Sequence, residues 1–277
     1  MMMNPWLETT AVVILALLGI ATGVVFSRLK NPYWAWGYFL PLSLIALLLA
    51  ATYISTQTLI PIFAWISGGR ARFIILCLAV TVGSMTLIGR LPRKLEKVIV
   101  LLLMLAVVTW SSVLPFLVPA LIHNKLASLK TNFDSNNICF QSTDYTCAPA
   151  AAVTALTKLG FAAQEGQIAM LSHTSPIAGT LPWCLYKALQ NEYGPAGLEC
   201  KLRYFDSVSE LRNGGVTLAV VRDAFLLDHC VAVLDVTDNL VTIADPVWGR
   251  KSMSHKQFEK VWRFYGIVLQ RQPAHSS

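Results

Sequence analysis

Long apolar stretches without a charged side chain dominate the first 122 residues. Each has about the length that a helix needs to cross the hydrocarbon core of a bilayer, roughly 20 residues. The stretches are residues 9–26, 37–55, 73–89 and 98–122. A short interfacial piece ending at Gly69 is expected after the second stretch. The pattern therefore predicts an all-α transmembrane region of about four helices over residues 1–122, with five spans as the alternative.

From residue 133 onward the apolar runs are shorter and are interrupted by polar residues. Helical runs come first, and short runs rich in β-branched residues follow, which is typical of strands. The expected helices are residues 150–159, 164–171, 181–192 and 254–261, and the expected strands are residues 198–204, 216–221, 229–236, 240–244 and 265–269. Asp238 and Asn239 predict a hairpin turn. We expect a linker at 123–132, an α+β domain at 133–270 with N-terminal helices and a C-terminal antiparallel sheet, and a tail at 271–277.

Composition and charge narrow the class of protein. Only 13% of the 277 residues are charged and 55% are hydrophobic, whereas soluble domains carry about 25% charged residues. Residues 1–122 hold eight Lys or Arg and two Asp or Glu, a net +6 of the total +7. The basic balance thus comes from loops between apolar runs, and we expect no nucleic-acid partner. The apolar runs carry no Asp, Glu, Lys, Arg or His, which favours an anchor over a transporter.

The distribution of basic residues predicts how the chain crosses the membrane. With four spans and the N-terminus outside, six Lys or Arg lie in cytoplasmic loops and four lie outside, in the direction of the positive-inside rule. This predicts a multi-pass protein of the cytoplasmic (inner) membrane, with the C-terminal domain on the outer, periplasmic face. A fifth span would reverse that orientation. The first apolar run is expected to be a retained anchor, because Glu8 precedes it and no cleavage site follows.

Four residues in the C-terminal half have the chemistry of a nucleophilic site. Cys147 lies at the start of a predicted helix, where the helix dipole favours a thiolate. His229 begins a strand and is a candidate general base and acid. Asp245 ends the next strand, so the predicted hairpin places it beside His229, where it can orient the imidazole. Gln141, six residues before the cysteine, offers an amide for an oxyanion.

These residues, together with Gly179-Thr180, the run His229–Val233 and the sequence Ala244-Asp245-Pro246, resemble the C39 family of papain-like cysteine peptidases. The resemblance covers about residues 135–268. It implies that Cys147 is the nucleophile, His229 the general base and acid, Asp245 the orienting residue and Gln141 the oxyanion donor. It also implies a peptide or protein substrate, such as a leader-bearing precursor, and no cofactor or metal. The chain shows no nucleotide-binding P-loop, so we expect no ATP-binding module in it.

Two departures from the family pattern keep other functions open. Ala148 stands where a glycine is usual, and Cys230 stands where an aromatic residue is common. The first hypothesis is a membrane-anchored cysteine endopeptidase. The alternatives are a catalytically silent C39-like module that binds a peptide at the membrane, and an acyl transferase that uses the same triad.

Other residues compete for these roles. Cys139 is the rival nucleophile, but we expect it in a loop with no helix behind it. Asp228 is the rival orienting residue, although it should point to the opposite face of the strand from His229. Disulfide pairing is left open among the other thiols of the C-terminal half, which are Cys139, Cys184, Cys200 and Cys230. The spacing of Cys and His predicts no zinc site.

Overall fold

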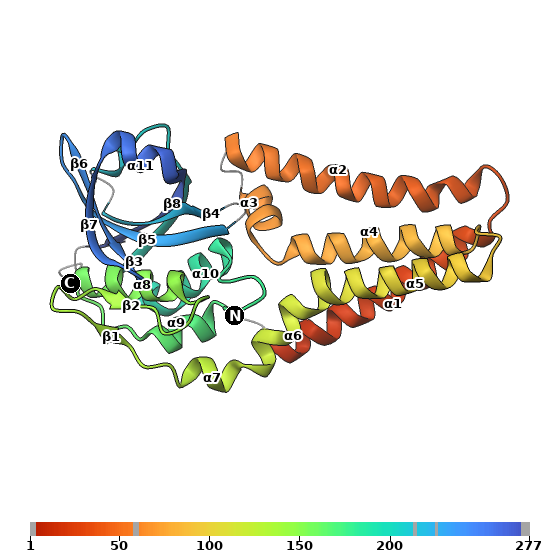
Figure 1. The fold of residues 1–277 in the computed structure, drawn as a ribbon, viewed down its shortest axis with the longest axis horizontal. Helices are drawn as coiled ribbons and strands as arrows, with labels where there is room; N and C mark the ends of the chain where they lie inside the picture. Colours follow the sequence, from red (N-terminus) through yellow and green to blue (C-terminus); the bar gives the residue numbers. More distant parts are fainter. Residues whose placement is uncertain (1–3, 58–60, 213–214, 225–226, 273–277) are drawn as a thin grey trace. The chain divides into compact units, whose positions relative to one another are not determined.

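The structure, a computed structural model, describes residues 4–57, 61–212, 215–224 and 227–272. The chain divides into two compact units, which separate between Leu121 and Ile122. Figure 1 shows that the first unit is built of helices and that the second combines helices with an antiparallel sheet. This agrees with the predicted class, a helical region followed by an α+β domain.

The helical unit contains four helices long and apolar enough to span a membrane, counted over the described residues. The second of these spans begins in the short helix η1 (Tyr33–Ala35), and the fourth is continuous through a π-helical turn, Thr109–Val113. The α-helices of this unit are α1 (Pro5–Arg28), α2 (Trp36–Gln57), α3 (Pro61–Gly68), α4 (Ala71–Ile88), α5 (Lys94–Val108) and α6 (Leu114–Leu121). The eight-residue α3 lies where a short interfacial piece was predicted.

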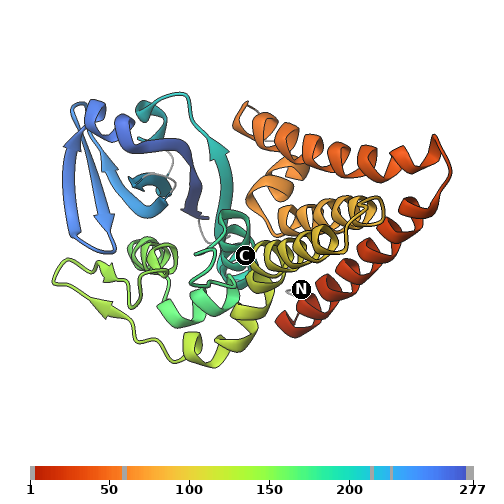
Figure 2. The same cartoon turned by 45° about the vertical axis from the view of Figure 1, so that its right-hand side comes forward.

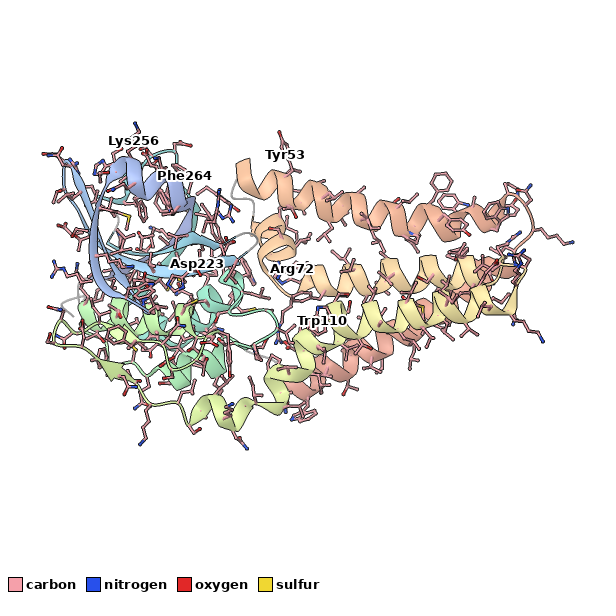
Figure 3. All side chains as sticks on the ribbon, in the orientation of Figure 1. Tyr53, Arg72, Trp110, Asp223, Lys256 and Phe264 are labelled. Atoms are coloured by element: carbon pink, nitrogen blue, oxygen red, sulfur yellow. The ribbon has the colours of Figure 1, made fainter. Side chains whose placement is uncertain are left out.

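Small residues allow the spans to pack closely on their inner sides. A Cβ atom at Gly23 of α1 would lie 2.7 Å from the Val82 carbonyl oxygen of α4, so only glycine fits there. The outward-facing side chains are apolar and aromatic: Tyr53 is 70% exposed and Trp110 is 66% exposed, and both are labelled in Figure 3. Exposed apolar surface of this extent is what lipid covers in a membrane protein.

The second unit is an antiparallel sheet flanked by helices. Its helices are α7 (His123–Ala127), α8 (Cys147–Lys158), α9 (Glu165–Leu171), α10 (Pro182–Tyr193) and α11 (His255–Val261). Its strands are β1 (Asn132–Phe133), β2 (Cys139–Phe140), β3 (Leu198–Tyr204), β4 (Val216–Ala224), β5 (Leu227–Val236), β6 (Leu240–Asp245), β7 (Gly249–Ser254) and β8 (Trp262–Arg271). The large sheet has the strand order β3-β8-β4-β5-β6-β7, while β1 and β2 pair separately.

Each face of the large sheet carries its own core. Along β5, Cys230 and Ala232 belong to the core beneath α8, whereas Val231 and Val233 belong to the core beneath α11, as alternation along a strand requires. Figures 1 and 2 show α8 and α10 on one side of the sheet and α11 on the other. Five of the twelve residues of α8 are alanine and nine of the twelve are buried, which lets this helix approach the sheet closely.

Candidate active site

The helix α8 presents Cys147 at its first position. Thr146 precedes it and is fully buried, and its hydroxyl accepts a hydrogen bond from the Thr143 N–H at 3.1 Å. The N–H groups of a first helical turn have no partner within the helix, and their partial positive charge favours an anion. Cys147 is half-buried, so the start of α8 is partly open to solvent at this residue.

The strands β5 and β6 bring His229 and Asp245 together. Ala232 pairs with Ala244, and continuing this register places Asp245 one strand away from His229 on the same face of the sheet. The His229 Nε2 atom lies 3.0 Å from Asp245 Oδ1. The Val247 N–H donates to the same oxygen at 2.9 Å. The predicted hairpin is therefore the element that joins the two residues.

The charges at this site reinforce one another. Burial alone would lower the pKa of His229, but its hydrogen bonds to Asp245 and Cys147, and the charges of both, raise that pKa from 6.5 to about 9. For Asp245, burial alone would raise the pKa, yet hydrogen bonds from His229 and from the Val247 N–H lower it, as does the nearby positive charge of Lys251. The Lys251 Nζ atom lies 3.5 Å from Asp245 Oδ2. Both pKa shifts favour the charged forms, an imidazolium beside a carboxylate.

Gln141 lies between β2 and α8, in the segment that leads to Cys147. Its N–H donates to the Pro246 carbonyl at 3.0 Å, which ties this segment to the residue after Asp245. The side-chain Oε1 atom is buried and has no hydrogen-bond partner within the described residues. A buried polar atom without a partner costs about 1–3 kcal/mol, and this oxygen is not held in place by a hydrogen bond within the described residues.

The rival residues lie in environments that do not suit catalysis. Cys139 belongs to β2 and is fully buried, so the expectation of a loop position is wrong; burial, helped by the charge of Glu165, raises its pKa to about 12. Asp228 forms an ion pair with Arg263 at 2.7 Å. All six cysteines are free thiols. The described part of the chain contains no cluster of three or more His, Cys, Asp or Glu that could hold a metal ion.

The comparisons with known proteins match the C-terminal half of the chain. The family model described as "Peptidase C39 family" matches residues 135–276. The chain belongs to the peptidase C39 family. The match covers half of the chain and contains every residue of the site described above.

Two curated relatives are similar to about half of this chain. An uncharacterized protein of Methanothermobacter marburgensis is 27% identical over 144 residues, which are 52% of this chain and 95% of that protein. An uncharacterized protein of Methanothermobacter thermautotrophicus is 24% identical over 143 residues, which are 52% and 94% of the two chains.

Solved structures of peptidase domains were also found. The peptidase domain of Streptococcus ComA, a bi-functional ABC transporter involved in a quorum-sensing pathway, is 22% identical, with a TM-score of 0.42 over 48% of this chain and 96% of that domain. A double-glycine-motif protease from an AMS/PCAT transporter, solved in complex with a leader peptide, is 15% identical, with a TM-score of 0.42 over 52% and 96% of the two chains.

The structure adds residues that reasoning from the sequence missed. Lys251 of β7 contacts Asp245, but β7 itself was not predicted. Glu165 of α9 is fully buried, and its carboxylate accepts two hydrogen bonds from Ser142. In the sequence, a glutamate in the first turn of a helix is typical of an exposed helix end, so no signal distinguished this one.

Proposed function

We propose that this protein is a membrane-anchored cysteine endopeptidase that cleaves a peptide or protein, such as a leader-bearing precursor. The observation that carries the proposal is the 3.0 Å contact between His229 Nε2 and Asp245 Oδ1, in a site where Cys147 as well as Asp245 raises the pKa of His229. Membership of the peptidase C39 family supports it, because C39 proteins are cysteine peptidases.

In the first half of the proposed reaction, His229 holds the proton of Cys147 as an imidazolium. The thiolate sulfur attacks the carbonyl carbon of the scissile peptide bond, and the carbonyl oxygen becomes an oxyanion. The Cys147 N–H at the start of α8 and the Gln141 side-chain amide donate hydrogen bonds to this oxyanion. His229 then gives its proton to the leaving amine, the C–N bond breaks, and an acyl-thioester remains on Cys147.

In the second half, His229 is neutral and acts as the base. It takes a proton from a water molecule while the water oxygen attacks the thioester carbon. Collapse of the new tetrahedral intermediate breaks the C–S bond, releases a carboxylic acid and returns the thiolate–imidazolium pair. Asp245 keeps the imidazole ring in one orientation and stabilises its charged form throughout.

The four apolar helices support a role as a membrane anchor. Because four spans alternate in direction, the loops near Arg28 and Lys94 share one side, and Ile122 emerges on the other. The basic loops favour the cytoplasmic side, so we place the peptidase domain on the outer face of the cytoplasmic membrane. A membrane-impermeant maleimide added to intact cells should therefore label Cys147; labelling only after lysis would contradict this orientation.

Product analysis separates this function from the two alternatives that share the site. The purified full-length chain is incubated with a peptide library, and the products are identified by mass spectrometry. Endopeptidase activity gives new carboxyl and amino termini, which Cys147→Ala abolishes and the control Cys184→Ala retains. New amide products formed with an added amine would indicate an acyl transferase. A library left intact by a chain that still binds peptides would indicate a silent binding module.

A further inference from the structure

A buried carboxylate that the proposed mechanism does not use lies next to the Gln141 segment. Glu165 is 0% exposed. Its Oε1 atom accepts a hydrogen bond from the Ser142 N–H at 2.8 Å, and its Oε2 atom accepts one from the Ser142 hydroxyl at 2.6 Å. Burying a carboxylate is costly unless it is hydrogen-bonded, so these two hydrogen bonds stabilise the buried position of Glu165. Together they fix both the backbone and the side chain of the residue that follows Gln141.

The same pair of residues also binds the segment that leaves the helical unit. The Ser142 hydroxyl oxygen lies 3.0 Å from the Lys130 carbonyl oxygen. The Glu165 N–H donates to the Thr131 hydroxyl oxygen at 2.9 Å. Lys130 and Thr131 precede the family match, which begins at residue 135. The hydrogen bond from the Glu165 N–H to Thr131 therefore ties a segment outside the family domain to the residue that holds the Gln141 segment.

The helix α7, directly before this segment, packs tightly against α9. Leu126 of α7 is almost completely buried. A Cβ atom at Gly166 would lie 2.6 Å from the Leu126 carbonyl oxygen and 3.0 Å from that of Leu129. Backbone atoms cannot easily move aside, so position 166 requires glycine. Gly166 directly follows Glu165. The first turn of α9 therefore packs against α7 through Gly166 and binds the residue after Gln141 through Glu165.

We propose that Glu165 is a positioning residue and that residues 123–131 are a working part of the peptidase domain, because together they hold Gln141 and Ser142 where an oxyanion forms. This inference rests on the function proposed above. Oxyanion donors act within about 2.7–3.1 Å of the developing charge, and a displacement of about 1 Å can cost about a hundredfold in rate. The segment that connects the membrane anchor to the catalytic domain therefore supports acylation, whereas the Cys147–His229 pair does not depend on it.

Two reactions of the same thiol test this inference in the full-length, detergent-solubilised chain. p-Nitrophenyl acetate acylates Cys147 through a tetrahedral oxyanion and releases p-nitrophenolate. Iodoacetamide alkylates the same sulfur by displacing iodide, with no oxyanion. We expect Glu165→Gln to lower the acylation rate by about tenfold or more while alkylation at Cys147 stays unchanged. The matched control is Glu192→Gln, an exposed glutamate bonded to Gln167, which should change neither rate.

Further variants keep the test decisive. If Glu165→Gln does not fold, Ser142→Ala removes the same hydroxyl bond and should give the same split between the two reactions. Gly166→Ala should give it too, because it displaces α7. Its control is Gly194→Ala, where the added Cβ meets only the flexible Gln190 side chain.

Three results would overturn the inference. Unchanged acylation in both Glu165→Gln and Ser142→Ala would show that Glu165 does not position the oxyanion donors. A parallel loss of both reactions in folded variants would show a purely structural role. A wild-type chain that is alkylated but never acylated at Cys147 would instead refute the proposed function, and this inference with it.

Discussion

Removing the carboxylate of Asp245 should lower the pKa of His229 substantially. In the folded protein, the rise of that pKa from 6.5 to about 9 occurs despite burial, which acts in the opposite direction. This rise corresponds to about 3 kcal/mol in favour of the imidazolium. Asp245→Ala removes one of the two partners and leaves Cys147 in place. Since one adjacent opposite charge changes a pKa by about 1–3 pH units, we expect the His229 pKa to fall by at least about one unit.

Nuclear magnetic resonance of the full-length chain with carbon-13-labelled histidine measures this directly. The His229 signal is assigned by its loss in His229→Ala, and its chemical shift is followed against pH. The wild-type midpoint should lie near pH 9, and the Asp245→Ala midpoint should be lower. Asp228→Ala is the matched control, because Asp228 adjoins His229 in the chain but pairs with Arg263. An Asp245→Ala midpoint equal to that of the wild type would refute the assigned role of Asp245.

Three further predictions concern stability. The folded-state pKa of His229 is raised from 6.5 to about 9, so the stabilisation that it gives is complete below about pH 6.5 and is lost as pH rises through about 9. The difference in unfolding free energy between wild type and His229→Ala, measured by denaturant titration, should therefore shrink over that pH range. A constant difference would contradict the ion pair. Cys139→Ser should destabilise the domain by about 1–3 kcal/mol in the same titrations, yet leave Cys147 alkylation intact; loss of alkylation would point to Cys139 as a participant. Gly23→Leu should lower the melting temperature in detergent, since its side chain would meet the Val82 carbonyl; an unchanged melting temperature would argue against the α1–α4 packing.

The elements that could be predicted are those whose hydrophobic period is strong. The four apolar helices and the strand β3 follow directly from runs of apolar and β-branched residues. The strand β7 was missed because it is an edge strand of the sequence GRKSMS with mostly exposed side chains, so it lacks an apolar period. The strands β1 and β2 have two residues each, too short for any pattern.

The same distinction applies to the candidate site. The proximity of His229 and Asp245 depends on a hairpin, whose register is set locally by its turn, so the sequence could predict it. The contact between Glu165 and Ser142 depends on how α9 packs against the segment before α8. No local pattern encodes such packing, and the burial of Cys139 in β2 was unpredictable for the same reason.

The most direct test of the central claim is the alkylation rate of Cys147 as a function of pH, in the full-length chain and in its His229→Ala variant. Mass spectrometry of the Cys147 peptide separates it from the other thiols. A thiolate held by the His229 imidazolium should react rapidly well below pH 7, and His229→Ala should abolish that reactivity. An ordinary thiol reacts appreciably only near pH 8.5. A slow rate that rises only in that range and does not depend on His229 would contradict a catalytic pair.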